Sequence, residues 1–208
     1  MGRVLLASIY DVKPKFQAML QPLCRRLAAV GFTANQVTLL AAGLSIAHGL
    51  VLWWQPGRAI WLLLLPVTLF IRMALNAIDG MLAREHGQKS RLGAILNELC
   101  DAVSDTALYL PFALIPGLSP AAAVLATILA VLTELTGVLG PMVGSLRRYD
   151  GPMGKSDRAF AFGLLAVLIA ATAIPAQWAV AYQGAIVGLL VLTIYYRAAK
   201  ALAGGEAK

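Results

Sequence analysis

Charged residues are scarce in this 208-residue chain, at 13% of the sequence, whereas hydrophobic residues make up 60%. A soluble domain carries about 25% charged residues, so the composition excludes an ordinary soluble domain and predicts an integral membrane protein. The chain has only two cysteines, Cys24 and Cys100, too few for a disulfide framework. It also has only two histidines, and no Cys/His spacing typical of a zinc site is present.

Other features that the sequence lacks limit how the chain can be divided into segments and domains. The first residues lack a signal-peptide pattern, because Asp11, Lys13 and Lys15 interrupt any apolar segment there. No internal repeat, low-complexity tract or domain boundary is evident in the sequence. We therefore expect residues 1–208 to form a single membrane domain.

Apolar segments account for most of the chain. Residues 8–30 mix apolar and basic side chains at helical spacing, which predicts an amphipathic helix on the membrane surface. The alternative is a soluble helix docked on the domain. Thr33 is a suitable N-cap for the first of the spanning segments that follow, which cover about 36–54, 59–83, 92–115, 119–144, 158–174 and 178–197. The prediction is an all-α membrane protein with six transmembrane helices plus an N-terminal interfacial helix.

The basic residues predict the orientation of these helices. With both termini in the cytoplasm, Arg58 alone lies on the opposite side and Arg72 lies within a span. The inner segments carry the other fifteen of the seventeen Lys and Arg: Arg3, Lys13, Lys15, Arg25, Arg26, Arg84, Lys89, Arg91, Arg147, Arg148, Lys155, Arg158, Arg197, Lys200 and Lys208. This distribution follows the positive-inside rule. The net charge of +7 is then explained by basic residues that face anionic lipid headgroups, and binding to nucleic acid is not needed to account for it.

Acidic residues are few but clustered, since residues 76–105 hold five of the ten. Ionisable groups at membrane depth are costly and mark functional sites. The polar residues share one face on each of two successive helices: Asn76, Asp79 and Ala83 on the first, and Asn97, Asp101 and Asp105 on the second. A short loop separates these helices, so we expect antiparallel neighbours whose polar faces meet near the inner membrane surface.

Four carboxylates would then share a small volume, which predicts a metal site: Asp79, Glu98, Asp101 and Asp105. Like charges so close cannot all ionise without compensation. A divalent cation would supply it, and oxygen ligands suit Mg²⁺, Mn²⁺ or Ca²⁺. Nearby residues fit a phosphate ligand, because glycines leave room for close approach and an arginine can pair with phosphate: Gly80, Gly93 and Arg84.

This series resembles the signature of the CDP-alcohol phosphotransferase (CDP-alcohol phosphatidyltransferase) family, D-x-x-D-G-x-x-A-R, then eight residues, then G-x-x-x-D-x-x-x-D. The spacing is kept from Asn76 to Asp101, through Asp79-Gly80, Ala83-Arg84, Gly93 and Asn97. The segment Thr33-Ala34-Asn35-Gln36-Val37-Thr38 is similar to the element that opens the family's first span. The resemblance extends across most of the chain and is strongest over 33–105.

The resemblance implies an enzyme of phospholipid biosynthesis in the cytoplasmic (inner) membrane. It would move a phosphatidyl or phospho-alcohol group from CDP-diacylglycerol or another CDP-alcohol to an alcohol acceptor, release CMP, use Mg²⁺ or Mn²⁺, and form homodimers. By position, Asp79 and Asp101 would bind metal, and Asp101 would also act as the base toward the acceptor hydroxyl. The donor would lie against Asn35, Thr38, Gly80, Ala83, Arg84 and Gly93.

The chain departs from the pattern at Asn76 and Asn97, where the family has aspartate. An amide oxygen can bind a metal but brings no charge, so the site loses two negative charges. Glu98 and Asp105 are candidates to restore them as additional metal ligands. The alternative is a catalytically weakened or non-catalytic member that binds lipid or nucleotide, and a transporter is a third class.

Four other charged residues are weaker candidates. Lys155 and Arg158 open a predicted helix and could bind a phosphate of the acceptor or the donor. Arg72 and Glu134 could form a structural ion pair across spans.

Overall fold

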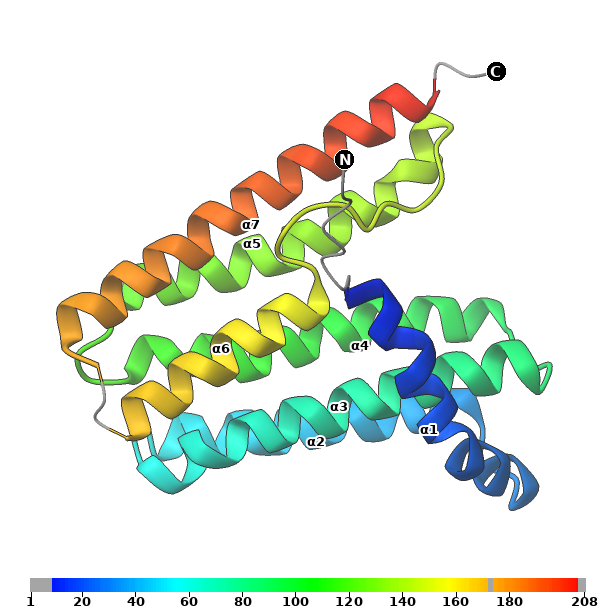
Figure 1. The fold of residues 1–208 in the computed structure, drawn as a ribbon, viewed down its shortest axis with the longest axis horizontal. Helices are drawn as coiled ribbons and strands as arrows, with labels where there is room; N and C mark the ends of the chain where they lie inside the picture. The colour runs from blue at the N-terminus through cyan, green and yellow to red at the C-terminus, as the bar shows by residue number, and fades with distance from the viewer. Residues whose placement is uncertain (1–8, 172–173, 206–208) are drawn as a thin grey trace, which may run out of the picture.

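The computed structural model describes residues 9–171 and 174–205, and every regular element in these ranges is helical (Figure 1). The α-helices are α1 Ile9–Ala29, α2 Ala34–Trp54, α3 Ala59–Glu85, α4 Arg91–Tyr109, α5 Pro120–Leu139, α6 Lys155–Ala170 and α7 Ala176–Gly205. Two 3-10 turns, η1 Leu110–Leu114 and η2 Gly140–Val143, continue α4 and α5.

Each apolar segment predicted from the sequence contains one long helix. Thr33 caps α2 as expected, because its side chain accepts a hydrogen bond from the backbone N–H of Gln36, and Gln36 reaches back to the cap. The third segment changes from α to 3-10 geometry at Leu110, next to Pro111, which cannot donate a backbone hydrogen bond. Residue 8 of the predicted surface helix and residues 172–173 of the predicted fifth span lie outside the described residues.

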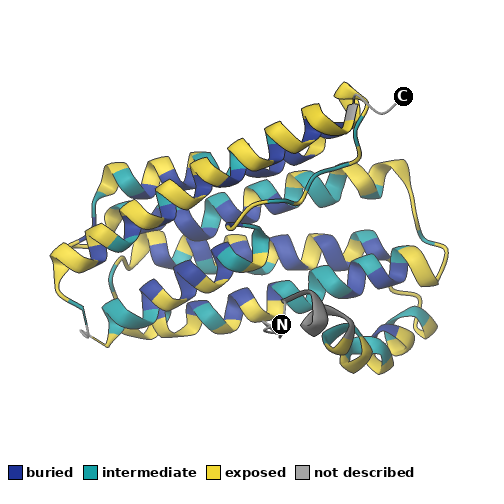
Figure 2. Ribbon diagram, turned by 45° about the horizontal axis from the view of Figure 1, so that its top comes forward, coloured by how far each residue is buried: buried dark blue, intermediate teal, exposed yellow. Residues whose placement is uncertain are grey.

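Four of the described helices are long and apolar enough to cross a membrane: α2, α3, α5 with η2, and α7. The other two predicted spans fall short of this measure for different reasons. Helix α4 carries Arg91, Glu98, Asp101 and Asp105, and α6 is only 16 residues long. Large apolar side chains such as Leu39, Phe70 and Val191 are exposed on the outside of the bundle, where the exposed faces of the helices are visible in Figure 2. An apolar outer surface suits lipid rather than water.

The helices pack in an order that the sequence does not reveal. Helix α2 packs against both α3 and α4, α6 packs against α3, and α7 packs against α5. The short loop makes α3 and α4 antiparallel as predicted (Figure 1), but α2 joins them, and side chains bridge α3 to α4 directly. The polar faces of α3 and α4 therefore meet across a gap that the start of α2 flanks.

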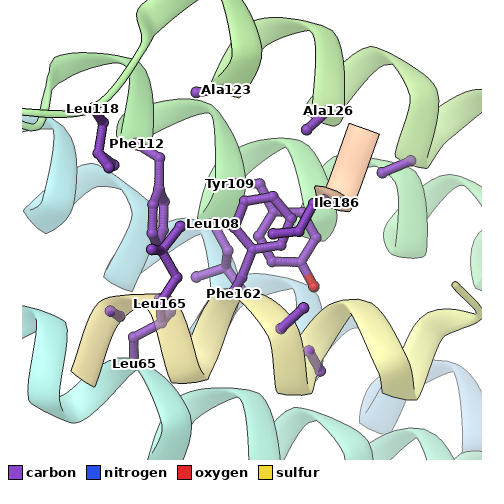
Figure 3. Close-up of a cluster of buried hydrophobic side chains, with 14 of the residues drawn as sticks. Leu65, Leu108, Tyr109, Phe112, Leu118, Ala123, Ala126, Phe162, Leu165 and Ile186 are labelled. Atoms are coloured by element: carbon purple, nitrogen blue, oxygen red, sulfur yellow. The ribbon is translucent and has the colours of Figure 1, made fainter. Parts of the chain in front are cut away.

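The apolar core lies beside this gap, farther from the α3–α4 loop. Its centre is an aromatic stack in which the rings of Tyr109 and Phe162 lie 3.9 Å apart, with Phe112 edge-on to Phe162 at 5.2 Å (Figure 3). Leu65 and Leu108 fill the space around the rings and are fully buried. The core thereby links α3, α4, η1 and α6 on the side of the polar residues that is farther from the α3–α4 loop.

Helix α1 crosses the bundle at the end where the α3–α4 loop lies (Figure 1). It docks on α3 through a small cluster around the buried Cys24, and Gln21 donates a hydrogen bond of 2.7 Å to Glu85. Met19 and Leu23 on another face of α1 stay exposed. The helix therefore has one apolar side against the protein and another that is free.

Gly49 allows α2 and α4 to approach closely, and this generates a test of the packing. A Cβ atom at Gly49 would lie 2.2 Å from the carbonyl oxygen of Ala107, whereas a Cβ at Gly43 on the same helix would meet nothing within 4 Å. We expect Gly49→Ala to destabilise the fold by about 1–3 kcal/mol through overpacking. Gly43→Ala should leave stability unchanged or raise it, since alanine favours a helix by about 1 kcal/mol.

Thermal unfolding of both variants in detergent measures this difference. Equal unfolding midpoints for the two variants would contradict the close packing of α2 on α4.

Candidate functional site

A cavity of about 510 Å³ opens at the end of the bundle where α2 begins, α3 ends and α4 begins. The segment between η2 and α6 covers one side of it. Its lining residues are Ala34, Asn35, Thr38, Asn76, Asp79, Gly80, Ala83, Arg84, Gln88, Lys89, Ser90, Gly93, Ala94, Asn97, Glu98, Arg147, Tyr149 and Lys155. The cavity thus gathers all the site residues predicted from the sequence except Asp101, Asp105 and Arg158, which do not line it.

The first turn of α2 forms one wall of the cavity. Thr38 donates a hydrogen bond of 2.7 Å to Asp79, which is only 5% exposed, so this carboxylate is fixed against α2. Gln88 of the α3–α4 loop accepts a hydrogen bond of 2.6 Å from the backbone N–H of Ala34. A side chain at Gly93 would clash with Asn35, since its Cβ would lie 2.7 Å from Asn35 Oδ1. Gly93 therefore leaves the space that the Asn35 side chain occupies where α4 passes the start of α2.

Asp101 lies at the inner edge of the cavity and is held by three donors. Asn76 donates to its Oδ1 at 3.1 Å, and Arg72 reaches the same oxygen at 3.3 Å. Lys155 forms an ion pair with Oδ2. Asp101 is only 4% exposed, so its carboxylate is largely enclosed by these groups. Asn76 therefore has its amide nitrogen directed at Asp101, which orients its amide oxygen away from that carboxylate.

Asp105 lies one turn deeper than Asp101, between two arginines. Arg72 donates to its Oδ1 at 2.5 Å, and Arg158 approaches its Oδ2 at 2.8 Å. Arg158 is fully buried and also pairs with Glu134 at 2.8 Å. These contacts place Asp105 and Arg158 inside a buried charge network rather than in the cavity.

The expected ion pair between Arg72 and Glu134 does not occur. Arg72 pairs with Asp101 and Asp105, because α6 rather than α5 packs on α3. Glu134 instead pairs with Arg158, and with Arg197 and Arg147 at 3.5 Å each. The predicted pairing is therefore wrong, although each group forms ion pairs with other partners.

Glu98 and Arg147 face each other across the mouth of the cavity. They form an ion pair, and the guanidinium of Arg147 also lies 4.9 Å from the centre of the Tyr149 ring. Arg147, Tyr149 and Gln88 were not among the predicted site residues. They lie outside the α-helices, where no periodic pattern points to them.

The segment that carries Arg147 and Lys155 is anchored to α7. Asp150 pairs with Lys200 at 2.8 Å and with Arg148 at 2.9 Å. Partial burial raises the pKa of the Asp150 carboxyl, but these two cations outweigh burial and hold the pKa below its usual range. The backbone N–H of Met153 donates to Thr193 at 2.9 Å. This anchoring fixes the approach of Lys155 to Asp101.

The cavity offers the oxygen ligands that a hard divalent cation prefers, but these ligands carry little negative charge. Asp79, Asn76 and Asn97 offer oxygen atoms to the cavity, and Asp101 touches Asn76. Oxygen ligands are those that Mg²⁺ and Mn²⁺ prefer. Among the described residues no group of three His, Cys, Asp or Glu side chains is arranged to hold a metal, since two of the four positions are amides.

Comparisons with known proteins agree with this geometry. Residues 32–196 match the sequence model of the CDP-alcohol phosphatidyltransferase family. The chain is 48% identical over 171 residues to the inner membrane protein YnbA of Escherichia coli, covering 82% of this chain and 83% of that protein. It is 34% identical over 104 residues to the phosphatidylinositol phosphate synthase of Corynebacterium glutamicum, covering 50% of this chain but only 45% of that enzyme.

Solved structures share the fold. The phosphatidylinositol phosphate synthase of Mycobacterium tuberculosis in complex with manganese and citrate superposes with a TM-score of 0.72 at 23% identity, over 86% of this chain and 87% of that one. The same enzyme with CDP-DAG bound gives a TM-score of 0.69 at 22% identity, over 89% and 92%.

The buried charges generate a test. Asp105→Asn leaves Arg72 and Arg158 buried without their shared counter-charge, so we expect a loss of about 3 kcal/mol or more of stability. Asp150→Asn, which removes a carboxylate from a partly exposed cluster, should cost less than about 1 kcal/mol. Unfolding midpoints of the two variants in the same detergent measure the contrast, and a loss at Asp105 no greater than at Asp150 would contradict the network.

Proposed function

Because the chain belongs to the CDP-alcohol phosphatidyltransferase family, we propose that it is a membrane transferase that moves a phosphatidyl or phospho-alcohol group from a CDP-linked donor to an alcohol acceptor. CMP is the second product. One observation carries the proposal for this chain: Asp79 of α3 lines the cavity, and Asp101 of α4 lies at its edge, bonded to Asn76 of the same lining.

The proposed enzyme is a multi-pass protein of the inner membrane, and its E. coli relative is named an inner membrane protein. In this arrangement α4 and α6 complete six spans, because Lys155 and Arg158 of α6 pair with Asp101 and Asp105 of α4 inside the bundle rather than facing lipid. Helix α1 lies in the interface with Met19 and Leu23 toward the acyl chains. Both termini and the cavity lie on the cytoplasmic side, following the distribution of Lys and Arg.

The donor occupies the wall formed by α2 and the end of α3. A relative's structure holds CDP-DAG, which makes CDP-diacylglycerol the leading donor. In this proposal Asn35 and Thr38 contact the nucleotide together with Gly80 and Ala83, where no bulky side chain obstructs it. Arg84 pairs with a phosphate. Gly93 supports this wall, since it lets Asn35 hold its position against α4.

A divalent cation, Mg²⁺ or Mn²⁺, would be held by Asp79 and Asp101 with the amide oxygens of Asn76 and Asn97. When bound, it would offset the charge that develops on the departing CMP phosphate. Glu98 remains a candidate outer ligand, because it lines the cavity although it pairs with Arg147. We assign Asp105 and Arg158 to the buried network instead, since both are engaged there and lie outside the cavity.

Asp101 is the proposed base. The acceptor hydroxyl oxygen bonds to the transferred phosphorus, the bond from that phosphorus to the CMP oxygen breaks, and the hydroxyl proton passes to a carboxylate oxygen of Asp101. Lys155 occupies Oδ2 of Asp101, so it must move as the acceptor binds. A phosphate on the acceptor, placed between Lys155 and Arg147, would draw the ammonium away from Asp101.

A non-catalytic member of the family is the second candidate function. The observation that favours it is the enclosure of Asp101 by Arg72, Asn76 and Lys155, together with asparagine at two motif positions. Such a protein would bind CDP-linked lipid without releasing CMP. The assay below separates the two functions.

CMP release from CDP-diacylglycerol by the purified protein, with Mg²⁺ or Mn²⁺ and a panel of free and phosphorylated alcohols, tests the proposal. We expect release that depends on the metal, and a loss of at least about 100-fold in Asp79→Asn and in Asp101→Asn. Glu85→Gln, a change on α3 outside the cavity, is the matched control and should retain activity. If the wild type binds CDP-diacylglycerol but releases no CMP with any alcohol, the non-catalytic function is correct.

A further inference from the structure

The cavity has lost two negative charges at Asn76 and Asn97, and a lysine ammonium lies against one of the two remaining motif carboxylates. Lys155, the first residue of α6, forms its ion pair with Oδ2 of Asp101. The lysine side chain is 29% exposed and lines the cavity, so its ammonium lies between the carboxylate and the space where ligands bind.

Ion pairs connect the carboxylates of this site to cationic side chains rather than leaving them free for metal. Four carboxylates belong to the connected set: Glu98, Asp101, Asp105 and Glu134. Five cations pair with them: Arg72, Arg147, Lys155, Arg158 and Arg197. The connected set therefore holds one more positive than negative charge. Asp79 adds a negative charge to the cavity lining, whereas Arg84 and Lys89 add two positive ones, so the site is positive before any metal ion binds.

Two more aspartates in place of Asn76 and Asn97 would add two negative charges, the amount that one further divalent cation neutralises. Asparagine in place of two aspartates therefore removes the negative charge that one divalent cation would balance. The anchored segment holds Lys155 where it supplies positive charge beside Asp101 without any ion.

We infer that Lys155 is a built-in cation of this site, so that the chain binds one divalent ion, centred on Asp79, while the ammonium of Lys155 serves Asp101. This inference rests on the proposed function, since it concerns the metal that the transferase would use. It makes Lys155 a positioning residue that competes with metal for Asp101.

Competition between Lys155 and the metal ion predicts the direction in which metal affinity changes when the lysine is removed. This change can be measured without any enzymatic turnover. Removing the ammonium frees Oδ2 of Asp101 and removes a repulsive charge, so metal should bind more tightly. A lysine that only contacts substrate phosphate, or only supports the fold, would leave metal affinity unchanged or weaken it.

The experiment is titration of Mn²⁺ into the purified full-length chain in detergent, with free Mn²⁺ followed by electron paramagnetic resonance. The wild type should bind one ion per chain. Lys155→Met should bind Mn²⁺ at least about tenfold more tightly. Lys89→Met removes a cation from the same cavity that forms no ion pair among the described residues, and should change affinity by less than about threefold.

A second variant tests the same account through the number of ions bound. Asn76→Asp/Asn97→Asp/Lys155→Met restores the two carboxylates and removes the ammonium, so it should bind two ions per chain. Two ions in the wild type, no ion in the wild type, or unchanged or weaker binding in Lys155→Met would each overturn the inference. CMP release measured on the same preparations shows separately whether the proposed function stands.

Discussion

The pairing of Asp105 with Arg72 and Arg158 is the interaction on which the rest of the site depends. It joins α3, α4 and α6 at a point where the carboxylate is only 2% exposed and Arg158 is fully buried. Each buried charge costs several kcal/mol to remove from solvent and is tolerated only when its partners are in place. Glu134 and Arg197 extend the network to α5 and α7. The network thus fixes the relative positions of five helices by mutual dependence.

The functional residues are arranged on top of this network. Arg72 reaches from Asp105 to Asp101, which sets the position of the proposed base. Asp79 is set independently by Thr38 of α2 and lines the cavity, whereas Asp101 lies at the inner edge of the cavity. Lys155 enters from α6, two residues after Met153, whose backbone is tied to α7. A site built from five separate elements is therefore held in place by contacts that lie outside its own lining.

Much of this could be predicted from the sequence, because helical spacing decides which residues share a face. The face holding Asn76 and Asp79 and the face holding Asn97 and Asp101 do meet, and Asn76 touches Asp101. Spacing does not reveal depth, so Asp105, one turn further along α4, could not be distinguished from a cavity residue. Nor does it reveal which helices are neighbours, and Arg72 therefore pairs with α4 residues rather than with Glu134. Arg147 and Gln88 lie in irregular segments without a period.

The most direct test of the central claim, that this cavity makes a lipid, is mass spectrometry of total lipids from a host that expresses the chain, compared with a host that expresses Asp79→Ala at the same level. The account predicts a phospholipid class that is present with the wild type and absent with Asp79→Ala. Identical lipid profiles in the two hosts, with both proteins folded in the membrane and acceptor alcohols supplied, would contradict it.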